Sequence, residues 1–306
     1  GLGKHVVLLT GDEEYRSEEA MVQLAKILAF RHGFRTTVLF AIDPNDGTIN
    51  PNINDTLPGA ELLGGADAMV MGLRFRRYPD EIMKHIETAY LAGKPIVAVR
   101  TSTHAFRFQE GDTTSYRRYS FRDKSWPGGF GRQVLGETWV THLGDNHEEA
   151  TRAIAAPEAG DHPLLRGVAA IFAPSGAYAV DPMADSTILM RAEVLAGMDR
   201  DAPLEDTGKN DPLQPVAWAR MHKNEQGTTN RVLCTTMGAA TDLLDESLRR
   251  LLVNGVYWGL EMPVPQRADV RLVGEYQPSD YSFDGFRKGV KPADLAMTSD
   301  DVSENQ

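Results

Sequence analysis

The sequence predicts an α/β fold in which a mostly parallel central sheet is covered by helices on both faces. In residues 1–105, short apolar runs alternate with segments whose apolar side chains recur at helical spacing. Strands that are apolar along their whole length are typical of parallel sheets buried on both faces. Helices that connect such strands give a three-layer sandwich with right-handed crossovers.

The first half of the chain supplies these elements in order. Residues 5–9 predict a strand, and residues 17–33 predict a helix with Ser17 as its N-cap and Gly33 as its C-cap. The pattern repeats with strands at 36–42, 67–73 and 95–100 and a helix at 79–92 that Gly93 closes. Ligands bind beyond the carboxyl ends of the strands in such sheets, so the loops after these strands form the candidate site.

The second half is less regular, with longer loops between its predicted elements. Residues 107–130 predict a long ordered loop, and residues 245–260 predict an amphipathic helix. The other predicted elements are a short helix at 131–137, strands with polar turns over 151–178 and 186–194, a surface loop at 199–213, and a strand at 231–236 followed by a turn at Met237 and Gly238.

Residues 1–262 are expected to form one domain, because no linker-like segment separates two halves with their own core patterns. Residues 263–306 lack a clear periodicity, and we expect an irregular C-terminal extension packed on the domain. Its last residues, 299–306, are polar enough to fray.

The charge balance argues against two classes of partner. The chain has 32 Lys and Arg against 43 Asp and Glu, a formal net charge of −11, which repels nucleic acid and anionic lipid. No apolar run approaches the length of a membrane span, and the first residues show no signal-peptide pattern. We therefore expect a soluble protein with a small-molecule ligand and with no nucleic-acid or membrane partner. A homo-oligomer that associates through exposed helices stays open.

The single cysteine, Cys234, excludes an internal disulfide. It lies in an apolar strand pattern, where a buried and inert thiol is expected.

Titratable and charged side chains follow several of the predicted strands, and the carboxyl ends of parallel strands meet at one edge of a sheet. Carboxylates and imidazoles can perform general acid/base chemistry on a hydroxyl or on a carbon beside a carbonyl, and guanidinium groups can hold an oxyanion or a carboxylate. We predict His104, His142 and Glu14 as catalytic residues, and Arg100, Arg74, Arg76, Tyr15 and Phe106 as substrate-binding residues.

Several of these residues also have a structural interpretation. His104 could cap the start of a helix, and Arg100 could form a buried ion pair with Glu14 that only holds two loops together. The aromatic residues between 106 and 130 fit a sugar pocket, and core packing explains them equally well.

No cofactor is assigned. The glycines at 128–131 are not the strand-linked fingerprint of dinucleotide binding. His142, Asp145 and His147 are ligand types of a zinc site, but their spacing in a glycine-containing loop matches no standard signature. A divalent metal there is a secondary alternative, and no metal ligand is assigned.

Several segments together resemble the ThuA-like, or trehalose-utilisation, family of the class I glutamine amidotransferase-like superfamily. They are GDEEYRSEE at 11–19, RTSTHAF at 100–106, GFG at 129–131 followed by THLGD at 141–145, PVAWAR at 215–220, and RVLCTTMG at 231–238. The resemblance spans residues 5–260 and rests on the order of these segments.

This resemblance implies a flavodoxin-like fold and a role in bacterial carbohydrate metabolism. It places Arg100 at the elbow where amidotransferases carry their nucleophilic cysteine, and a guanidinium cannot attack a carbonyl. The chain is therefore not expected to be a glutaminase. ThuA-like proteins often have a histidine where this chain has Ala239. Residues 285–295 resemble members from exported carbohydrate-degrading systems, which favours the periplasm, with the cytoplasm as the alternative.

Two functions are compatible with this pattern. The first is an enzyme that acts on a sugar or keto-sugar derivative by acid/base chemistry, and the family name does not make trehalose its substrate. The second is a non-catalytic carbohydrate-binding or scaffold protein on an amidotransferase-like fold, which Arg100 and Ala239 favour.

Overall fold

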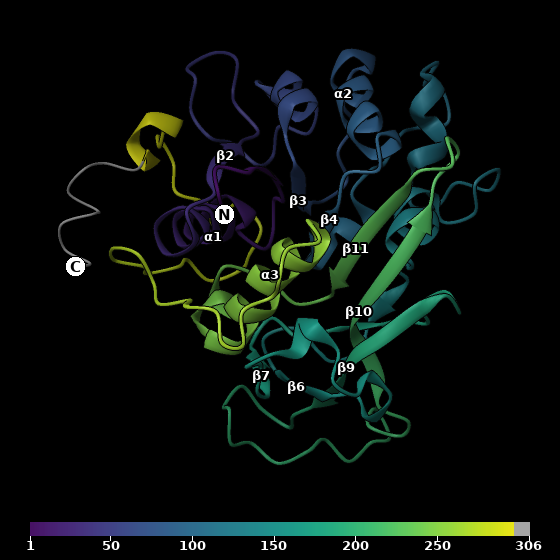
Figure 1. The fold of residues 1–306 in the computed structure, drawn as a ribbon. Helices are drawn as coiled ribbons and strands as arrows, with labels where there is room; N and C mark the ends of the chain where they lie inside the picture. Colours follow the sequence, from purple (N-terminus) through teal and green to yellow (C-terminus); the bar gives the residue numbers. More distant parts are fainter. Residues whose placement is uncertain (297–306) are drawn as a thin grey trace.

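A nine-stranded mixed sheet forms the centre of the molecule in the computed structural model, which describes residues 1–296 (Figure 1). Its strands, from one edge to the other, are β2 (Arg35–Leu39), β1 (His5–Gly11), β3 (Ala68–Leu73), β4 (Ile96–Val99), β11 (Thr229–Thr235), β10 (Gln214–Lys223), β9 (Ser186–Val194), β6 (Thr151–Ala155) and β7 (Ile171–Ala173). All pairings from β2 to β11 are parallel, and all pairings from β11 to β7 are antiparallel.

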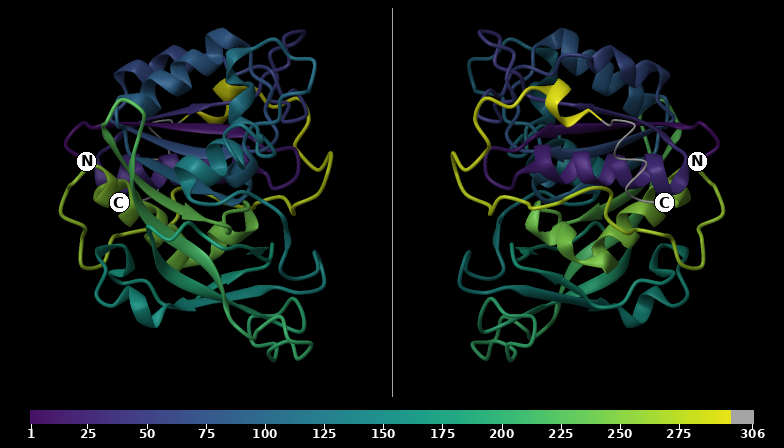
Figure 2. Two further views of the ribbon diagram at one scale, coloured as in Figure 1. Left: turned by 90° about the vertical axis from the view of Figure 1, so that its right-hand side faces the viewer. Right: turned by 90° about the vertical axis from the view of Figure 1, so that its left-hand side faces the viewer.

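Helices cover both faces of the parallel half. The α-helices in residues 1–296 are α1 (Ser17–His32), α2 (Asp80–Leu91) and α3 (Glu246–Gly259). The side views show α1 and α3 on one side of the sheet and α2 on the other (Figure 2). The predicted α/β sandwich is therefore confirmed, and the elements predicted up to residue 100 and after residue 230 agree with the structure within a few residues.

Short helices and a small two-stranded sheet fill the connections. The sheet pairs β5 (Thr141–His142) with β8 (Tyr178–Ala179) in antiparallel fashion. The short helices are η1 (Ala60–Gly65), η2 (Arg100–His104), η3 (Ser115–Tyr119), the π-helical η4 (Gly131–Leu135), η5 (Pro157–Ala159), η6 (Pro163–Leu165), η7 (Thr241–Leu244) and η8 (Pro292–Leu295).

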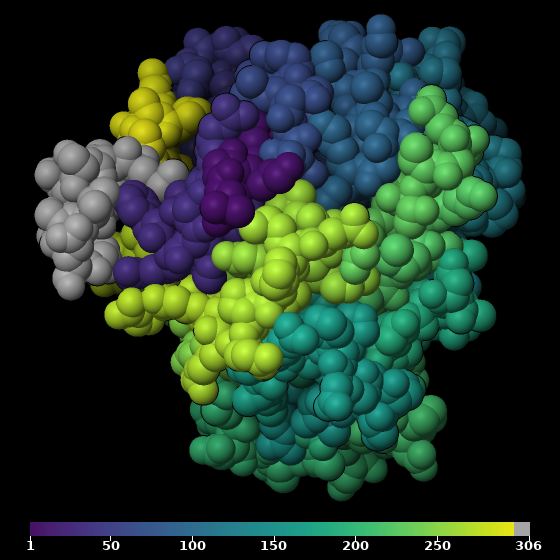
Figure 3. All heavy atoms as spheres, viewed as in Figure 1, coloured from purple at the N-terminus to yellow at the C-terminus, as the bar shows by residue number. Residues whose placement is uncertain are grey.

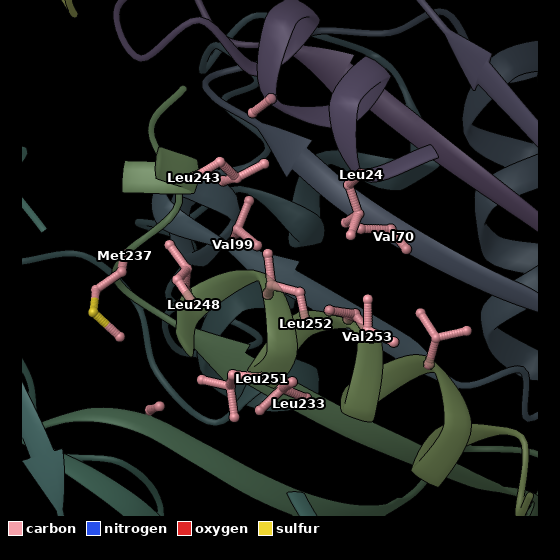
Figure 4. Packing of buried hydrophobic residues seen from close by; sticks show 14 of the residues in the cluster. Leu24, Val70, Val99, Leu233, Met237, Leu243, Leu248, Leu251, Leu252 and Val253 are labelled. Atoms are coloured by element: carbon pink, nitrogen blue, oxygen red, sulfur yellow. The ribbon is translucent and has the colours of Figure 1, made fainter. Parts of the chain in front are cut away.

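Side chains of alternate strand residues enter two separate cores. Val70, Val99 and Leu233 pack with α1 and α3, and the close view shows them beside Leu24 and Leu252 (Figure 4). Their strand neighbours, such as Ala98 and Cys234, belong instead to the core under α2 and η1. The parallel half thus has the fully buried strands that its apolar sequence predicts.

The antiparallel extension was not anticipated as part of the central sheet, and β10 is not among the predicted strands. A buried arginine interrupts its apolar pattern: Arg220 is 5% exposed. Its guanidinium is paired with Asp185, with nitrogen-to-oxygen distances of 2.9 and 3.0 Å, and also donates to backbone carbonyls of η4. A charged side chain that finds such partners can lie in a core, but its sequence pattern resembles an exposed face.

One predicted helix cap is wrong. Ser17 is the first residue of α1, and Arg16 is the N-cap, with a left-handed φ of 59°. The Ser17 hydroxyl accepts a hydrogen bond from the Gly11 N–H at 3.1 Å, so it ties the end of β1 to the helix instead of capping it. Gly33 is the predicted C-cap, with φ of 66°.

The described part of the C-terminal extension runs beside the N-terminal third of the chain, as the yellow and purple surfaces show (Figure 3). The Ser282 N–H donates to the Glu14 carbonyl at 2.9 Å, and the Ser279 N–H donates to the Glu19 carboxylate at 2.7 Å. This segment therefore reaches the loop after β1. The fraying predicted for residues 299–306 lies outside the described residues.

No helix in residues 1–296 is both long enough and apolar enough to cross a membrane.

A buried carboxylate lies at the start of α1. Glu18 is 6% exposed, and its oxygens have no hydrogen-bond partner among the described residues. Its charge partner is Arg16, with 3.6 Å between Glu18 Oε1 and Arg16 Nη1. Burial raises the pKa of Glu18 to about 7 although Arg16 opposes the shift.

We expect Glu18 to make the folded state less stable as the pH rises. Because the folded-state pKa is raised above the ordinary value of 4.5, its favourable contribution is complete below that value and is lost as the pH passes through about 7. Between pH 5 and pH 8 the unfolding free energy should fall in both proteins or in the wild type alone, and the fall should be smaller in Glu18→Gln by roughly 2 kcal/mol. Urea unfolding at both pH values measures this, and identical pH dependence in the two proteins would contradict it.

Candidate functional site

The loop after β1 is organised by a buried carboxylate. Asp12 is 1% exposed, and its Oδ1 accepts hydrogen bonds from the N–H groups of Glu14 and Tyr15 at 2.8 and 3.0 Å. Its Oδ2 accepts a hydrogen bond from the Thr101 hydroxyl at 2.6 Å. Asp12 therefore fixes Glu14 and Tyr15 at the carboxyl edge and links them to η2, which follows β4.

Arg100 occupies the elbow after β4 with a left-handed φ of 46°. Its guanidinium donates to the Gly176 and Thr236 carbonyls at 2.7 and 2.9 Å and to the Ser175 carbonyl at 2.6 Å. The side chain is 1% exposed. These contacts hold the segment before β8 and the end of β11 against the elbow, so they leave Arg100 inaccessible to a substrate.

Two tyrosine rings enclose the Arg100 guanidinium. Its central carbon lies 4.0 Å from the Tyr15 ring centroid and 4.7 Å from the Tyr178 ring centroid. Such contacts stabilise a desolvated cation. The alternative ion pair with Glu14 is not formed within residues 1–296, because Glu14 pairs with Arg74 instead.

A second buried carboxylate, Asp242, binds the segment that contacts Arg100. It accepts hydrogen bonds from the Ser175 hydroxyl at 2.6 Å and from the N–H groups of Gly238 and Ala239 at 2.9 and 3.0 Å. The segment that supplies carbonyls to Arg100 is thereby also tied to the turn after β11.

His104 lies inside the aromatic core beneath the edge. It is 2% exposed, and its ring centroid is 4.9 Å from that of Phe75, 5.3 Å from that of Trp139 and 5.7 Å from that of Tyr178. Burial, with Arg74 and Arg100 nearby, holds the pKa of His104 well below its usual range. The imidazole is therefore neutral and enclosed, which suits a packing role better than the predicted catalytic one.

His142 is nearer to the surface. It lies half-buried on β5, with its ring 5.4 Å from that of Tyr178 and 6.0 Å from that of Trp139. Burial, and then Arg100 and Arg74, lower the pKa of His142 to about 4, so its imidazole is neutral at neutral pH. Its Nδ1 and the Trp139 Nε1 have no hydrogen-bond partner among the described residues.

Alternating carboxylates and guanidiniums form the outer part of the site. Arg74 pairs with Glu14, with 3.0 Å between Nη2 and Oε2, and also contacts Glu13. Arg76 pairs with Glu13 at 2.7 Å. Burial raises the pKa of Glu14 and outweighs the attraction of Arg74. Glu14 is thus a more basic carboxylate than a solvated one, and it stands beside a cation.

Arg76 and Phe106, which were predicted to bind the substrate, are both buried. Arg76 is 1% exposed and donates to the carbonyls of Pro51 and Ile53 at 3.0 and 2.9 Å. Phe106 is 1% exposed and packs edge-on against Phe130 in the core under α2. Both were expected at the edge because they follow strands, but Phe106 lies in the core, and Arg76 is held by backbone carbonyls and by Glu13.

Tyr15 connects the site to the C-terminal residues. Its hydroxyl accepts a hydrogen bond from the Asn146 amide at 3.2 Å, and its ring stacks on Tyr281 with 5.3 Å between centroids. Tyr281 in turn stacks on His147 at 4.2 Å. No local pattern in the sequence indicates the role of Tyr281, because residues 263–306 lack periodicity. Asp12, in contrast, directly follows the first strand, which is the signal that also indicates Glu14.

His142 and His147 contact different aromatic rings: His142 lies against Tyr178 and Trp139, and His147 lies against Tyr281. Within residues 1–296, no three His, Cys, Asp or Glu side chains are arranged to hold a metal ion. Cys234 is buried, as expected, and burial raises the pKa of its thiol.

Two solved structures that resemble this chain are of proteins described as ThuA-like. The one from Parabacteroides merdae has a TM-score of 0.51 and 13% sequence identity, and the match covers 92% of this chain and 97% of that one. The one from Bacteroides uniformis has a TM-score of 0.49 and 13% identity, with 84% and 90% covered. No protein-family model and no curated protein sequence matches the chain. At this identity the likeness shows the fold alone, which is a ThuA-like fold.

Replacing Arg100 should destabilise the protein. In Arg100→Met, the three buried carbonyls that accept from the guanidinium lose their donor, and each unsatisfied group costs about 1–3 kcal/mol. We expect the unfolding free energy to fall by about 3 kcal/mol or more in urea titrations followed by circular dichroism. Arg267→Met is the matched control, because Arg267 is 72% exposed. A loss no larger than that of the control would contradict this structural role.

Proposed function

We propose that the carboxyl edge of the sheet binds a sugar or keto-sugar derivative and performs acid/base chemistry on it. The observation that carries this proposal is the position of Glu14. It is a nearly buried carboxylate with a raised pKa, and it is paired with Arg74 in a loop that Asp12 holds rigid. A base of this kind, with a cation beside it, is suited to remove a proton from a carbon next to a carbonyl.

The proton transfer can be written with the residues of this chain. Glu14 takes the proton from the carbon, the electron pair of that C–H bond moves into the bond toward the carbonyl carbon, and the carbonyl oxygen becomes an enolate oxygen. Arg74 lies 3.0 Å from Glu14, so its guanidinium is near the developing negative charge. A neutral His142 can donate or accept one further hydrogen bond to a sugar hydroxyl.

Aromatic surface near these groups supports a carbohydrate ligand. Trp139 is partly exposed, and Phe283 is 61% exposed with its ring centroid 5.2 Å from the central carbon of Arg74. Aromatic rings with one exposed face beside hydrogen-bonding groups are suited to the apolar faces of sugar rings. The resemblance of the ordered sequence segments to the ThuA-like family supports the same ligand class.

The elbow supports the view that the protein is not a glutaminase. The backbone at Arg100 has the strained left-handed conformation of a nucleophile elbow, but its side chain is a cation bonded to three carbonyls. Cys234 lies inside β11 in the core under α2 and is fully buried.

A non-catalytic carbohydrate-binding or scaffold protein is the second candidate. It is favoured by the packing of Ala239 with Tyr15 and Tyr281, which puts a methyl group where related proteins often have a histidine. The two candidates differ in one measurable property, because a binding protein retains its ligand without exchanging a proton with it.

Glu14→Gln should abolish proton abstraction without abolishing binding. We would incubate the protein in D₂O with a panel of mono- and disaccharides and their keto derivatives, and follow deuterium incorporation beside the carbonyl by NMR. The wild-type rate should rise with pH through a pKa above the ordinary carboxyl value of 4.5, because the base must be ionised. Exchange in the variant should fall by about 10²-fold or more. Saturable binding with no exchange in the wild type would support the binding protein instead.

His142→Phe tests the neutral imidazole separately. The substitution keeps a ring against Tyr178 and Trp139 but removes both nitrogens, so exchange should fall by about tenfold while the fold is retained. Because the pKa of His142 is near 4, the pH profile above pH 5 should keep its shape. A shifted pH profile would mean that His142, and not Glu14, provides the titrating group.

A further inference from the structure

A polar hollow adjoins the proposed site beside the loop that follows β3. It has a volume of about 390 Å³, and three arginines, Arg76, Arg77 and Arg107, line it together with the carboxylate of Glu13. Glu13 also contacts Arg74, the partner of Glu14, so the hollow and the proposed catalytic carboxylate share one chain of ion pairs.

The charges of this hollow do not cancel. Glu13 is shared between Arg74 and Arg76, and Arg77 is paired with Asp112 through two hydrogen bonds, one of them 2.9 Å long. Arg107 forms no ion pair and no side-chain hydrogen bond with any described residue, and its side chain is exposed. One guanidinium with free donors therefore faces the hollow in a protein whose net charge is −11.

The backbone holds Arg107 in place. The Arg107 N–H donates to the Arg76 carbonyl at 2.9 Å, and the Arg76 N–H donates to the Ala105 carbonyl at 2.6 Å. The loop after β3 and the segment after η2 are therefore paired at the hollow. Binding an anion there does not require the backbone of Arg107 to be ordered first.

Phe75 connects Arg107 to the proposed site. It lines the hollow and has a φ of 50°, a conformation that is unfavourable for a bulky residue. The central carbons of Arg74 and Arg107 lie 4.5 and 5.4 Å from its ring centroid. One cation is thus paired with Glu14 and the other is unpaired, with a single aromatic ring in contact with both.

Neutral donors complete the lining. The side-chain amides of Asn54 and Gln109 line the hollow, and neither has a hydrogen-bond partner among the described residues. An unpaired guanidinium with two unused amides is a donor-rich set, which suits the oxygens of a carboxylate or a phosphate.

We propose that this hollow binds the anionic group of an acidic sugar derivative, a carboxylate or a phosphate ester, while the rest of the sugar lies against Glu14 and Arg74. This inference rests on the proposed function for the position of the sugar, and it adds the substrate class. Arg107 is the residue that distinguishes acidic from neutral sugars.

The test is calorimetric titration of the full chain with D-glucuronate, D-glucose 6-phosphate and D-glucose. At least one acidic sugar should bind about tenfold or more tightly than glucose in the wild type. In Arg107→Gln the ratio of acidic to neutral affinity should fall by about tenfold. Arg267→Gln removes the same charge from an exposed arginine beside Glu246 that does not line the hollow, and should leave the ratio unchanged.

The two acidic probes identify the source of the anion: tighter glucuronate indicates a carboxylate, and tighter glucose 6-phosphate indicates a phosphate ester. Equal affinity for all three sugars, no binding of either acidic sugar, or an unchanged ratio in Arg107→Gln would overturn the anion site. Circular dichroism establishes that the variant is folded.

Glu14→Gln separates this inference from the proposed function. Preferential binding of an acidic sugar that depends on Arg107, without deuterium exchange in any protein, would leave the anion site in place and refute the chemistry. Deuterium exchange that depends on Glu14, but not on Arg107 or on the charge of the sugar, would support the chemistry and refute the anion site.

Discussion

The carboxyl edge of the sheet depends on the burial of one guanidinium. Arg100 is enclosed by protein and must be hydrogen-bonded, because an unpaired buried charge would cost more than the whole fold can supply. Its acceptors come from the segment before β8 and from the end of β11. The buried carboxylates Asp12 and Asp242 tie the same loops together through backbone N–H groups. These three charges therefore set the positions of the loops after β1, β4 and β11.

Because Arg100 is buried at the elbow, the candidate catalytic groups lie nearer to the surface than the elbow does. The elbow after β4 has a structural role, because the Arg100 guanidinium donates to three backbone carbonyls there. The polar groups that remain closer to the surface are Glu14 and Arg74, in the loops after β1 and β3, and His142 on β5. Burial shifts the pKa values of Glu14 and His142, and Tyr281 helps to cover Tyr15 beside Glu14. The surroundings of the site thus require chain segments that lie far apart in sequence.

Some of the predicted site residues carry a local signal in the sequence. Arg74 directly follows β3, and Glu14 lies in the loop just after β1, so both are expected at the carboxyl edge whatever the rest of the chain does. Arg76 follows β3 and Phe106 follows β4, but both residues are buried. Trp139 and Tyr178 were missed as site neighbours, because they come from irregular segments that only tertiary contacts place beside His142.

Periodicity and apolar runs were thus sufficient to predict the α/β class, the order of the strands and helices in the parallel half, and the sheet edge at which a ligand is expected. A strand that is buried on both faces needs apolar side chains along its whole length, so the sequence shows where it lies. Only the tertiary structure decided the direction of each side chain at that edge, the enclosure of His104 and the antiparallel extension of the sheet. It also decided that Arg100 bonds to backbone carbonyls and not to Glu14. These features depend on which distant groups satisfy a buried charge, and residue spacing along the chain carries no record of that choice.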